Sequence, residues 1–235
     1  MAEPTVWQVG SAVLGQVALL ALVTVLAGLG PLGWAVGLAY VLVVTVLLLL
    51  AMRRYGRWPL GPADLVTLVR VGLIGAVTAL VVDGGPAWAV VGVAAVALIL
   101  DWVDGLVARG TRTESDFGAR FDMEADAFLI LTLSVFVSLD LGPWVLVIGA
   151  MRYLFAVAAR LAPWLRGPLP PSLARKAVAA AQGIVLAVAA SGVLPWQVAA
   201  GAVACALAAL LWSFGRDVVG LWRARALRAD AAGKR

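Results

Sequence analysis

Residues 101–126, DWVDGLVARGTRTESDFGARFDMEAD, indicate the architecture of this chain, because acidic side chains stand here between two long apolar segments. Asp101 and Asp104 are three residues apart, and Asp122 and Asp126 are four apart. On an α-helix either spacing puts both side chains on one face. The residues between the pairs hold a turn, so the two helices run antiparallel and we expect all four carboxylates to converge at one depth.

Most of the remaining chain is strongly apolar. Of the 235 residues, 63% are hydrophobic and 13% are charged, and the mean hydropathy is +1.02. A soluble domain carries about a quarter charged residues, so this composition excludes a disordered chain and favours the lipid bilayer as solvent. The chain has no His and one Cys, Cys205. These counts exclude imidazole ligands, histidine bases and a disulfide framework.

Eight apolar segments are long enough to cross a bilayer, which requires about 20 residues. The breaks between them contain Gly-Pro, Asp or several Arg residues. We therefore predict an all-α integral membrane protein with eight spans, at 10–29, 33–51, 65–82, 86–108, 118–138, 142–161, 175–193 and 196–214.

The basic residues predict the orientation of these spans. All 18 Lys and Arg residues fall at or near every second connection or in the C-terminal tail. By the positive-inside rule that face is cytoplasmic, and so are both termini. The net charge of +5 is then a topology signal, and we expect no nucleic-acid partner. The tail, 215–235, is either solvated or a helix on anionic lipid headgroups.

Four carboxylates near hydrocarbon repel one another and resist desolvation, so they need compensation. They can pair with Arg109, Arg112 and Arg120, or lie at the interface as simple helix-end charges. Two pairs on adjoining helices favour one or two divalent cations with oxygen ligands instead. Glu124 points to the other side of its helix, so we leave it out of the site. The guanidinium of Arg109, one turn beyond the first pair, suits a phosphate group.

The spacing of this stretch resembles the signature of the CDP-alcohol phosphotransferases, D-x2-D-G-x2-A-R-x8-G-x3-D-x3-D. Its fixed positions are Asp101, Asp104, Gly105, Ala108, Arg109, Gly118, Asp122 and Asp126. The resemblance implies a six-helix membrane bundle over 62–214, with an active site open to the cytoplasm. The transmembrane hairpin 1–52 exceeds that core.

The reaction implied by the resemblance moves a phosphoalcohol group from a CDP-alcohol to an acceptor hydroxyl and releases CMP, as in phospholipid biosynthesis. The family uses Mg²⁺ or Mn²⁺; we expect two Mg²⁺ ions, with Asp101, Asp104 and Asp122 as main ligands. The fourth aspartate, Asp126, is implied as the general base and as a further metal contact. A carboxylate base also fits a chain without His.

Two further groups of residues complete the predicted site. By resemblance, the donor's cytidine diphosphate is held by Gly105, Arg109 and Ser115 with Asp64 and Thr67, which keep the family's spacing to Arg70. Asp64 stands where the family usually has Asn. For an anionic acceptor we predict a pocket with Arg152, near the middle of its span where a charge is costly, joined by Arg160, Arg175 and Lys176.

The donor and the acceptor stay open at this point. CDP-diacylglycerol is the favoured donor, since the site opens beside lipid; a soluble CDP-alcohol is the alternative. The acceptor is an alcohol or alcohol phosphate: glycerol phosphate, inositol phosphate, inositol, serine or another. An intramembrane prenyltransferase and a cation transporter are remote alternatives, because neither needs all these residues within one short stretch. We expect a multi-pass protein of a prokaryotic cell membrane, with a homodimer as one form.

Overall fold

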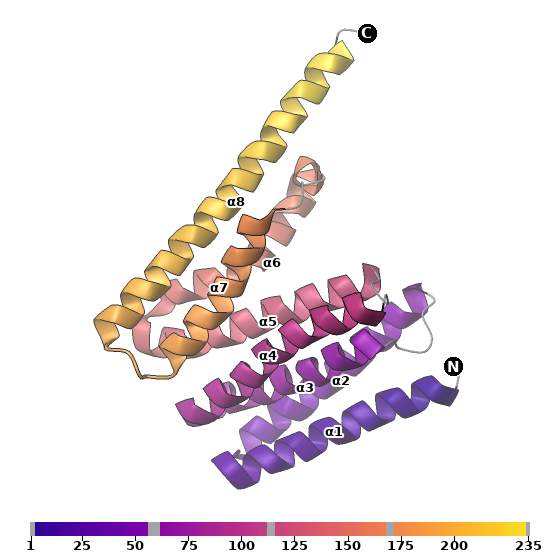
Figure 1. Ribbon diagram of the computed structural model, residues 1–235, viewed down its shortest axis with the longest axis vertical. Helices are drawn as coiled ribbons and strands as arrows, with labels where there is room; N and C mark the ends of the chain where they lie inside the picture. The colour runs from indigo at the N-terminus through magenta and orange to yellow at the C-terminus, as the bar shows by residue number, and fades with distance from the viewer. Residues whose placement is uncertain (1–2, 56–61, 112–115, 168–171, 234–235) are drawn as a thin grey trace. The chain divides into compact units, whose positions relative to one another are not determined.

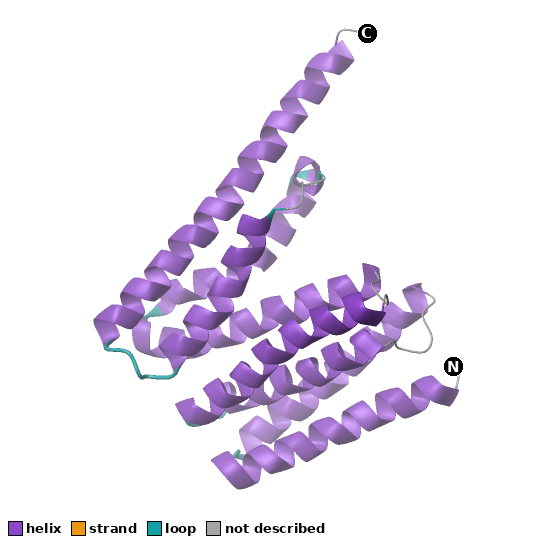
Figure 2. Ribbon diagram, viewed as in Figure 1, coloured by secondary structure: helices purple, strands orange, loops and turns teal. Residues whose placement is uncertain are grey.

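The computed structural model describes residues 3–55, 62–111, 116–167 and 172–233, and Figure 1 shows their course. Helices and short loops make up these ranges, which contain no strand (Figure 2). The elements in chain order are α1 (Glu3–Ala27), α2 (Pro31–Tyr55), α3 (Pro62–Val82), α4 (Ala87–Thr111), α5 (Asp116–Leu141), η1 (Pro143–Val145), α6 (Leu146–Leu161), η2 (Pro163–Arg166), α7 (Leu173–Ala190) and α8 (Trp196–Gly233). The all-helical prediction is confirmed for these residues.

Glycine and proline mark the turns at which the sequence predicts breaks. Four glycines have a left-handed backbone, at Gly28 (φ 73°), Gly84 (φ 72°), Gly142 (φ 97°) and Gly192 (φ 68°). A residue without Cβ adopts this conformation at little cost, so it commonly ends a helix. A proline within the next three residues stands at or near the start of the following element, where its missing N–H costs nothing.

Six of the described helices are long and apolar enough to be candidate membrane spans, at Trp7–Ala27, Pro31–Arg53, Asp64–Val82, Pro143–Leu161, Leu173–Ala190 and Trp196–Arg225. The chain is thus an integral multi-pass membrane protein, with six candidate spans where the sequence predicts eight. The other two helices, α4 and α5, carry the aspartates. Among the described side chains, the apolar part of α4 is Ala87–Val103, which includes Asp101.

The chain forms two compact units, and α5 contributes to both. Unit 1 comprises Met1–Thr132 with Ala190–Gly192, and unit 2 comprises Leu133–Ala189 with Val193–Arg235. In unit 1, α3 packs against α1, α2 and α4. The predicted division into 1–52, 62–214 and 215–235 follows other boundaries and stays a prediction.

The N-terminal hairpin is joined to α3 by polar contacts at one end. Asp83, directly after α3, accepts hydrogen bonds from the backbone N–H groups of Gly30 (2.6 Å) and Gly33 (2.9 Å). These groups lie at the start of α2, where a helix leaves N–H donors unpaired and favours negative charge. The indole of Trp34 also donates to Thr24 Oγ1 of α1, at 2.8 Å. Three helices are therefore tied together at this turn.

In unit 2, α8 is the longest element. Its 38 residues span roughly 57 Å at 1.5 Å per residue, which exceeds the roughly 30 Å of hydrocarbon in a bilayer. The predicted tail beyond residue 214 continues this helix without a break as far as Gly233. Gln182 of α7 donates to the carbonyl of Ala206 in α8 at 2.9 Å, and Phe155 of α6 packs edge-on against Phe214.

Candidate active site

Three of the four predicted aspartates come together in unit 1. Asp101 lies on α4, and Asp122 and Asp126 lie on α5. One carboxylate oxygen from each lies within 4.8 Å of the others. These side chains are between one-third and one-half exposed, at 42%, 37% and 41%. For these three residues the predicted convergence is found, because helical spacing places each side chain on the face that meets the neighbouring helix.

The other signature residues lie in part outside the described side chains. Asp104, Gly105, Ala108 and Arg109 belong to the last turns of α4, and nothing is described of their side chains. Ser115 lies outside the described residues altogether. Gly118 is in the first turn of α5. The metal, donor and structural roles of these residues stay predictions.

A buried arginine stands at the centre of the cluster. Arg70 of α3 is 0% exposed. Its Nη1 atom lies 2.8 Å from Oδ1 of Asp101 and 2.6 Å from Oδ1 of Asp122, and its Nη2 atom lies 2.8 Å from Oδ1 of Asp126. The Nη2 group also donates to the backbone carbonyl of Asp122 at 3.2 Å. A single guanidinium thus joins three helices, since it offers five N–H donors in a rigid fork.

This role of Arg70 was not predicted from the sequence, in which Arg70 was a topology signal and the last residue of the Asp64–Thr67–Arg70 spacing. Intervals of three put these side chains on one face of α3, and Asp64 (4% exposed) and Thr67 (2%) are buried with Arg70. Full burial of a permanently charged residue requires an acidic partner. An arginine well inside an apolar segment was therefore the available signal.

The pairing with Arg70 differs from the ion pairs considered from sequence. Arg120, one of the proposed partners, is exposed on α5, and the side chains of Arg109 and Arg112 are outside the described part. Glu124 is also exposed and does not belong to the aspartate group. Its exclusion from the cluster agrees with its predicted position on the other side of α5.

The donor set fits a hard divalent cation. One guanidinium against three carboxylates leaves this cluster with a formal excess of two negative charges. Oδ1 of Asp122 is buried and lies 2.6 Å from Nη1 of Arg70. Carboxylate oxygens are the ligands that Mg²⁺ and Mn²⁺ prefer. An acidic group of this kind can hold such an ion.

The predicted acceptor residues all lie in unit 2. Arg152 is half-buried near the middle of α6, and Arg160 and Lys176 are exposed. Arg175, in the first turn of α7, forms an ion pair with Asp217 of α8, with Nε 3.5 Å from Oδ2. Arg216 lies 3.7 Å from the same carboxylate and also donates to Ser172 Oγ at 3.1 Å. Asp217 and Arg216, which were not predicted from the sequence, join the middle of α8 to the start of α7.

Together, these features define a helical multi-pass membrane protein with a carboxylate cluster suited to a cation. The chain belongs to the CDP-alcohol phosphatidyltransferase family, whose sequence model matches residues 60–212, well over half of its length. It is therefore an enzyme of that family, which confirms the resemblance and disfavours the prenyltransferase and transporter alternatives. Comparisons with curated proteins and with solved structures gave no match. The matched segment begins just before α3, so α1 and α2 lie outside it.

Proposed function

We propose that this enzyme transfers a phosphatidyl group from CDP-diacylglycerol to an acceptor hydroxyl and releases CMP. The observation that carries the proposal is the group of Asp101, Asp122 and Asp126 around Arg70, all within the segment that matches the family. A lipid donor is favoured because the cluster is built on membrane helices, where a diacylglycerol chain has direct access from the bilayer.

The reaction forms a bond between the acceptor oxygen and the phosphorus that bears the diacylglycerol. The bond from this phosphorus to the bridging oxygen breaks, and CMP leaves with that oxygen. A Mg²⁺ or Mn²⁺ ion, or two such ions, held by Asp101, Asp104 and Asp122 would neutralise charge on both phosphates.

Asp126 takes the acceptor proton in this proposal. Its side chain is partly exposed, and Arg70 holds one of its oxygens at 2.8 Å, which fixes the orientation of the carboxylate. The chain has no His, so a carboxylate is the available base near the three-helix cluster. A positioned general base typically contributes about 10²–10⁴ to the rate.

Donor recognition would use the cytoplasmic end of α3 and the last turns of α4. Asp64 and Thr67 are buried on the same face of α3 as Arg70, which supports a shared site. Arg109, Gly105 and Ser115 complete the proposed contacts with the cytidine diphosphate. The acceptor, an alcohol or alcohol phosphate, would bind near Arg152, Arg160, Arg175 and Lys176.

We further propose eight membrane crossings, with α4 and α5 completing the six candidate spans. Both chain ends and the aspartate cluster would then face the cytoplasm of a prokaryotic cell, with every basic connection on that side.

The purified protein in lipid nanodiscs, incubated with CDP-diacylglycerol, Mg²⁺ and a panel of acceptors, tests this function. We expect CMP release that depends on one acceptor, with the phosphatidyl product identified by mass spectrometry. Asp101→Asn is the inactive control. Turnover of a soluble CDP-alcohol, with none of CDP-diacylglycerol, would establish the alternative donor. Absence of CMP release with both donors would overturn the proposal.

A further inference from the structure

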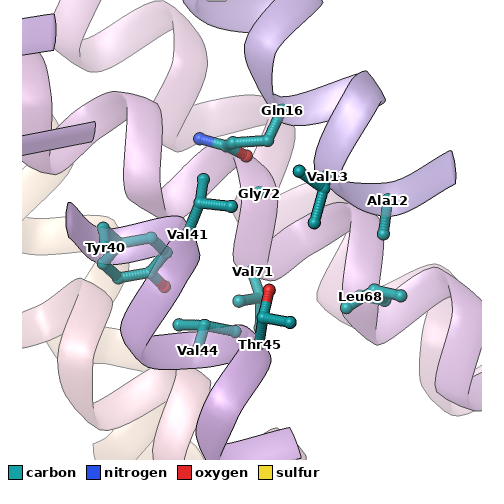
Figure 3. Close-up of a pocket in the computed structure, with 10 residues that line it drawn as sticks. All are labelled: Ala12, Val13, Gln16, Tyr40, Val41, Val44, Thr45, Leu68, Val71 and Gly72. Carbon is teal, nitrogen blue, oxygen red and sulfur yellow. The ribbon is translucent and has the colours of Figure 1, made fainter. Parts of the chain in front are cut away.

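Helices α1, α2 and α3 line a half-open cavity of about 40 Å³ that no part of the proposed reaction uses (Figure 3). Gln16 of α1, Tyr40 and Thr45 of α2, and Gly72 of α3 contribute to its walls, and most of the remaining wall is aliphatic. Figure 3 shows the side chain of Gln16 reaching from α1 toward Val41 and Gly72, with Thr45 one turn further along α2. The cavity thus combines an apolar wall with polar groups from two helices.

The cavity lies deep in the membrane-spanning part of the hairpin. Gln16 is near the middle of the candidate span Trp7–Ala27, and Gly72 is near the middle of Asp64–Val82. Phospholipids offer only hydrocarbon at such a depth. A polar group there must find its partners within the protein or in bound water.

Gln16 has a buried amide without a protein partner. The residue is 5% exposed, and both Oε1 and Nε2 lack a hydrogen bond among the described residues. The amide lies against α3, where a Cβ at Gly72 would come within 2.7 Å of Oε1, and one at Gly75 within 2.9 Å of Nε2. Two glycines therefore make room for this amide, although burying it unpaired is costly.

We propose that this cavity is an internal hydration site in which bound water joins Gln16 to Thr45. A site needs about 10–15 Å³ to hold one water molecule and two to four polar partners, so a cavity of about 40 Å³ has room for about three. A water molecule both donates and accepts hydrogen bonds, so it can pair with the amide of Gln16 and the hydroxyl of Thr45. A lipid acyl chain would leave the amide without a hydrogen bond. Both amide atoms are covered in the structure, so the proposal requires the Gln16 side chain to shift before bound water can reach them.

This hydration site adds to the Asp83 contacts that hold the hairpin on α3. Apolar helices in lipid gain little from hydrophobic burial, so interhelical hydrogen bonds and close packing at small residues hold them together. Water in the cavity supplies such bonds beside Gly72, which follows Arg70 by two residues on α3. The site is independent of the donor, the acceptor and the metal.

Hydroxyl-radical footprinting by X-ray radiolysis tests the proposal, because radicals generated from bound water oxidise the side chains beside it. In the full-length protein in nanodiscs, we expect oxidation of Tyr40 and Leu68, which line the cavity. Leu22, exposed on the outer surface of α1, reports the background in hydrocarbon. The double variant Gln16→Leu, Thr45→Val should lose the labelling of Tyr40 and Leu68 severalfold.

Thr78→Val is the matched control, since its hydroxyl donates to the carbonyl of Ile74 within α3 and does not line the cavity. This variant should keep the wild-type labelling. If Tyr40 and Leu68 of the wild-type protein were oxidised no more than Leu22, the cavity would be dry and the proposal would be overturned. An elongated lipid density in the cavity, seen by high-resolution electron cryomicroscopy, would also overturn it, whereas discrete water peaks would support it.

Discussion

The Nη1 atom of Arg70 lies 2.8 Å from Oδ1 of Asp101, although Arg70 stands outside the signature stretch that contains the aspartates. The same guanidinium reaches Asp122 and Asp126, so one buried side chain joins α3 to α4 and α5. Without it, three carboxylates would face one another within 4.8 Å. Arg70 therefore positions the residues that we propose as metal ligands and base.

Arg70→Met should destabilise the protein, because it leaves a group of carboxylates without its buried counter-charge. Breaking a buried ion pair on one side typically costs about 3–5 kcal/mol. Thermal unfolding in EDTA should show a lower midpoint for this variant, and added Mg²⁺ should raise that midpoint more than in the wild type. Arg70→Lys keeps the positive charge but lacks the planar guanidinium, so its unfolding midpoint should lie between those of Arg70→Met and the wild type. Equal midpoints for Arg70→Met and wild type would contradict the positioning role.

Asp101→Asn and Asp122→Asn should each abolish transfer while leaving a folded protein, since each removes a charge that we propose holds a divalent cation. Activity assays with each variant, and with wild type in EDTA, check this. Glu124→Gln is the matched control on α5, because Glu124 is acidic but exposed and outside the cluster; it should retain activity. Full wild-type activity in EDTA would refute the metal requirement.

Asp126→Asn should lower turnover by about 10²–10⁴, the usual effect of losing a general base. Its affinity for the CDP donor should change much less, because the proposed base faces the acceptor hydroxyl. Donor binding by calorimetry and single-turnover CMP release on the same variant separate the two effects. A loss of donor binding as large as the loss of rate would assign Asp126 to the donor site instead.

Arg152→Ala should raise the KM for an anionic acceptor with a smaller effect on kcat, because it removes ground-state binding. The guanidinium lies half-buried in the middle of α6, where a charge without a function is costly. Arg223→Ala, an exposed arginine on α8, serves as the control and should leave KM unchanged. If Arg152→Ala weakened donor binding and left the acceptor KM unchanged, the proposed location of the acceptor pocket would be wrong.

Asp83→Ala should lower the free energy of unfolding by about 0.5–2 kcal/mol, the usual effect of losing a side chain that caps a helix N-terminus. The carboxylate of Asp83 pairs with the N–H groups of Gly30 and Gly33. Asp140→Ala at the end of α5 is the control, since Asp140 is exposed. An Asp83→Ala midpoint equal to that of Asp140→Ala would mean that this contact contributes nothing to hairpin docking.

The local features of the chain were predictable because they depend on neighbouring residues. Long apolar segments predicted the helices. Glycines followed by a proline predicted the turns, at Gly28, Gly84, Gly142 and Gly192. Helical spacing also brought Asp101 to the same cluster as Asp122 and Asp126. Eight membrane crossings stay a prediction, since six of the described helices are candidate spans.

The helices, the signature aspartates and the family were predictable from the sequence, since each depends on spacings within one segment or across one turn. Which charges and polar groups meet depends instead on how the helices pack in three dimensions. The partners of Arg70 are 31, 52 and 56 residues away, and those of Asp83 are 50 and 53 residues away. No local periodicity encodes such pairs, because they form only when helices pack and exclude water from the groups between them.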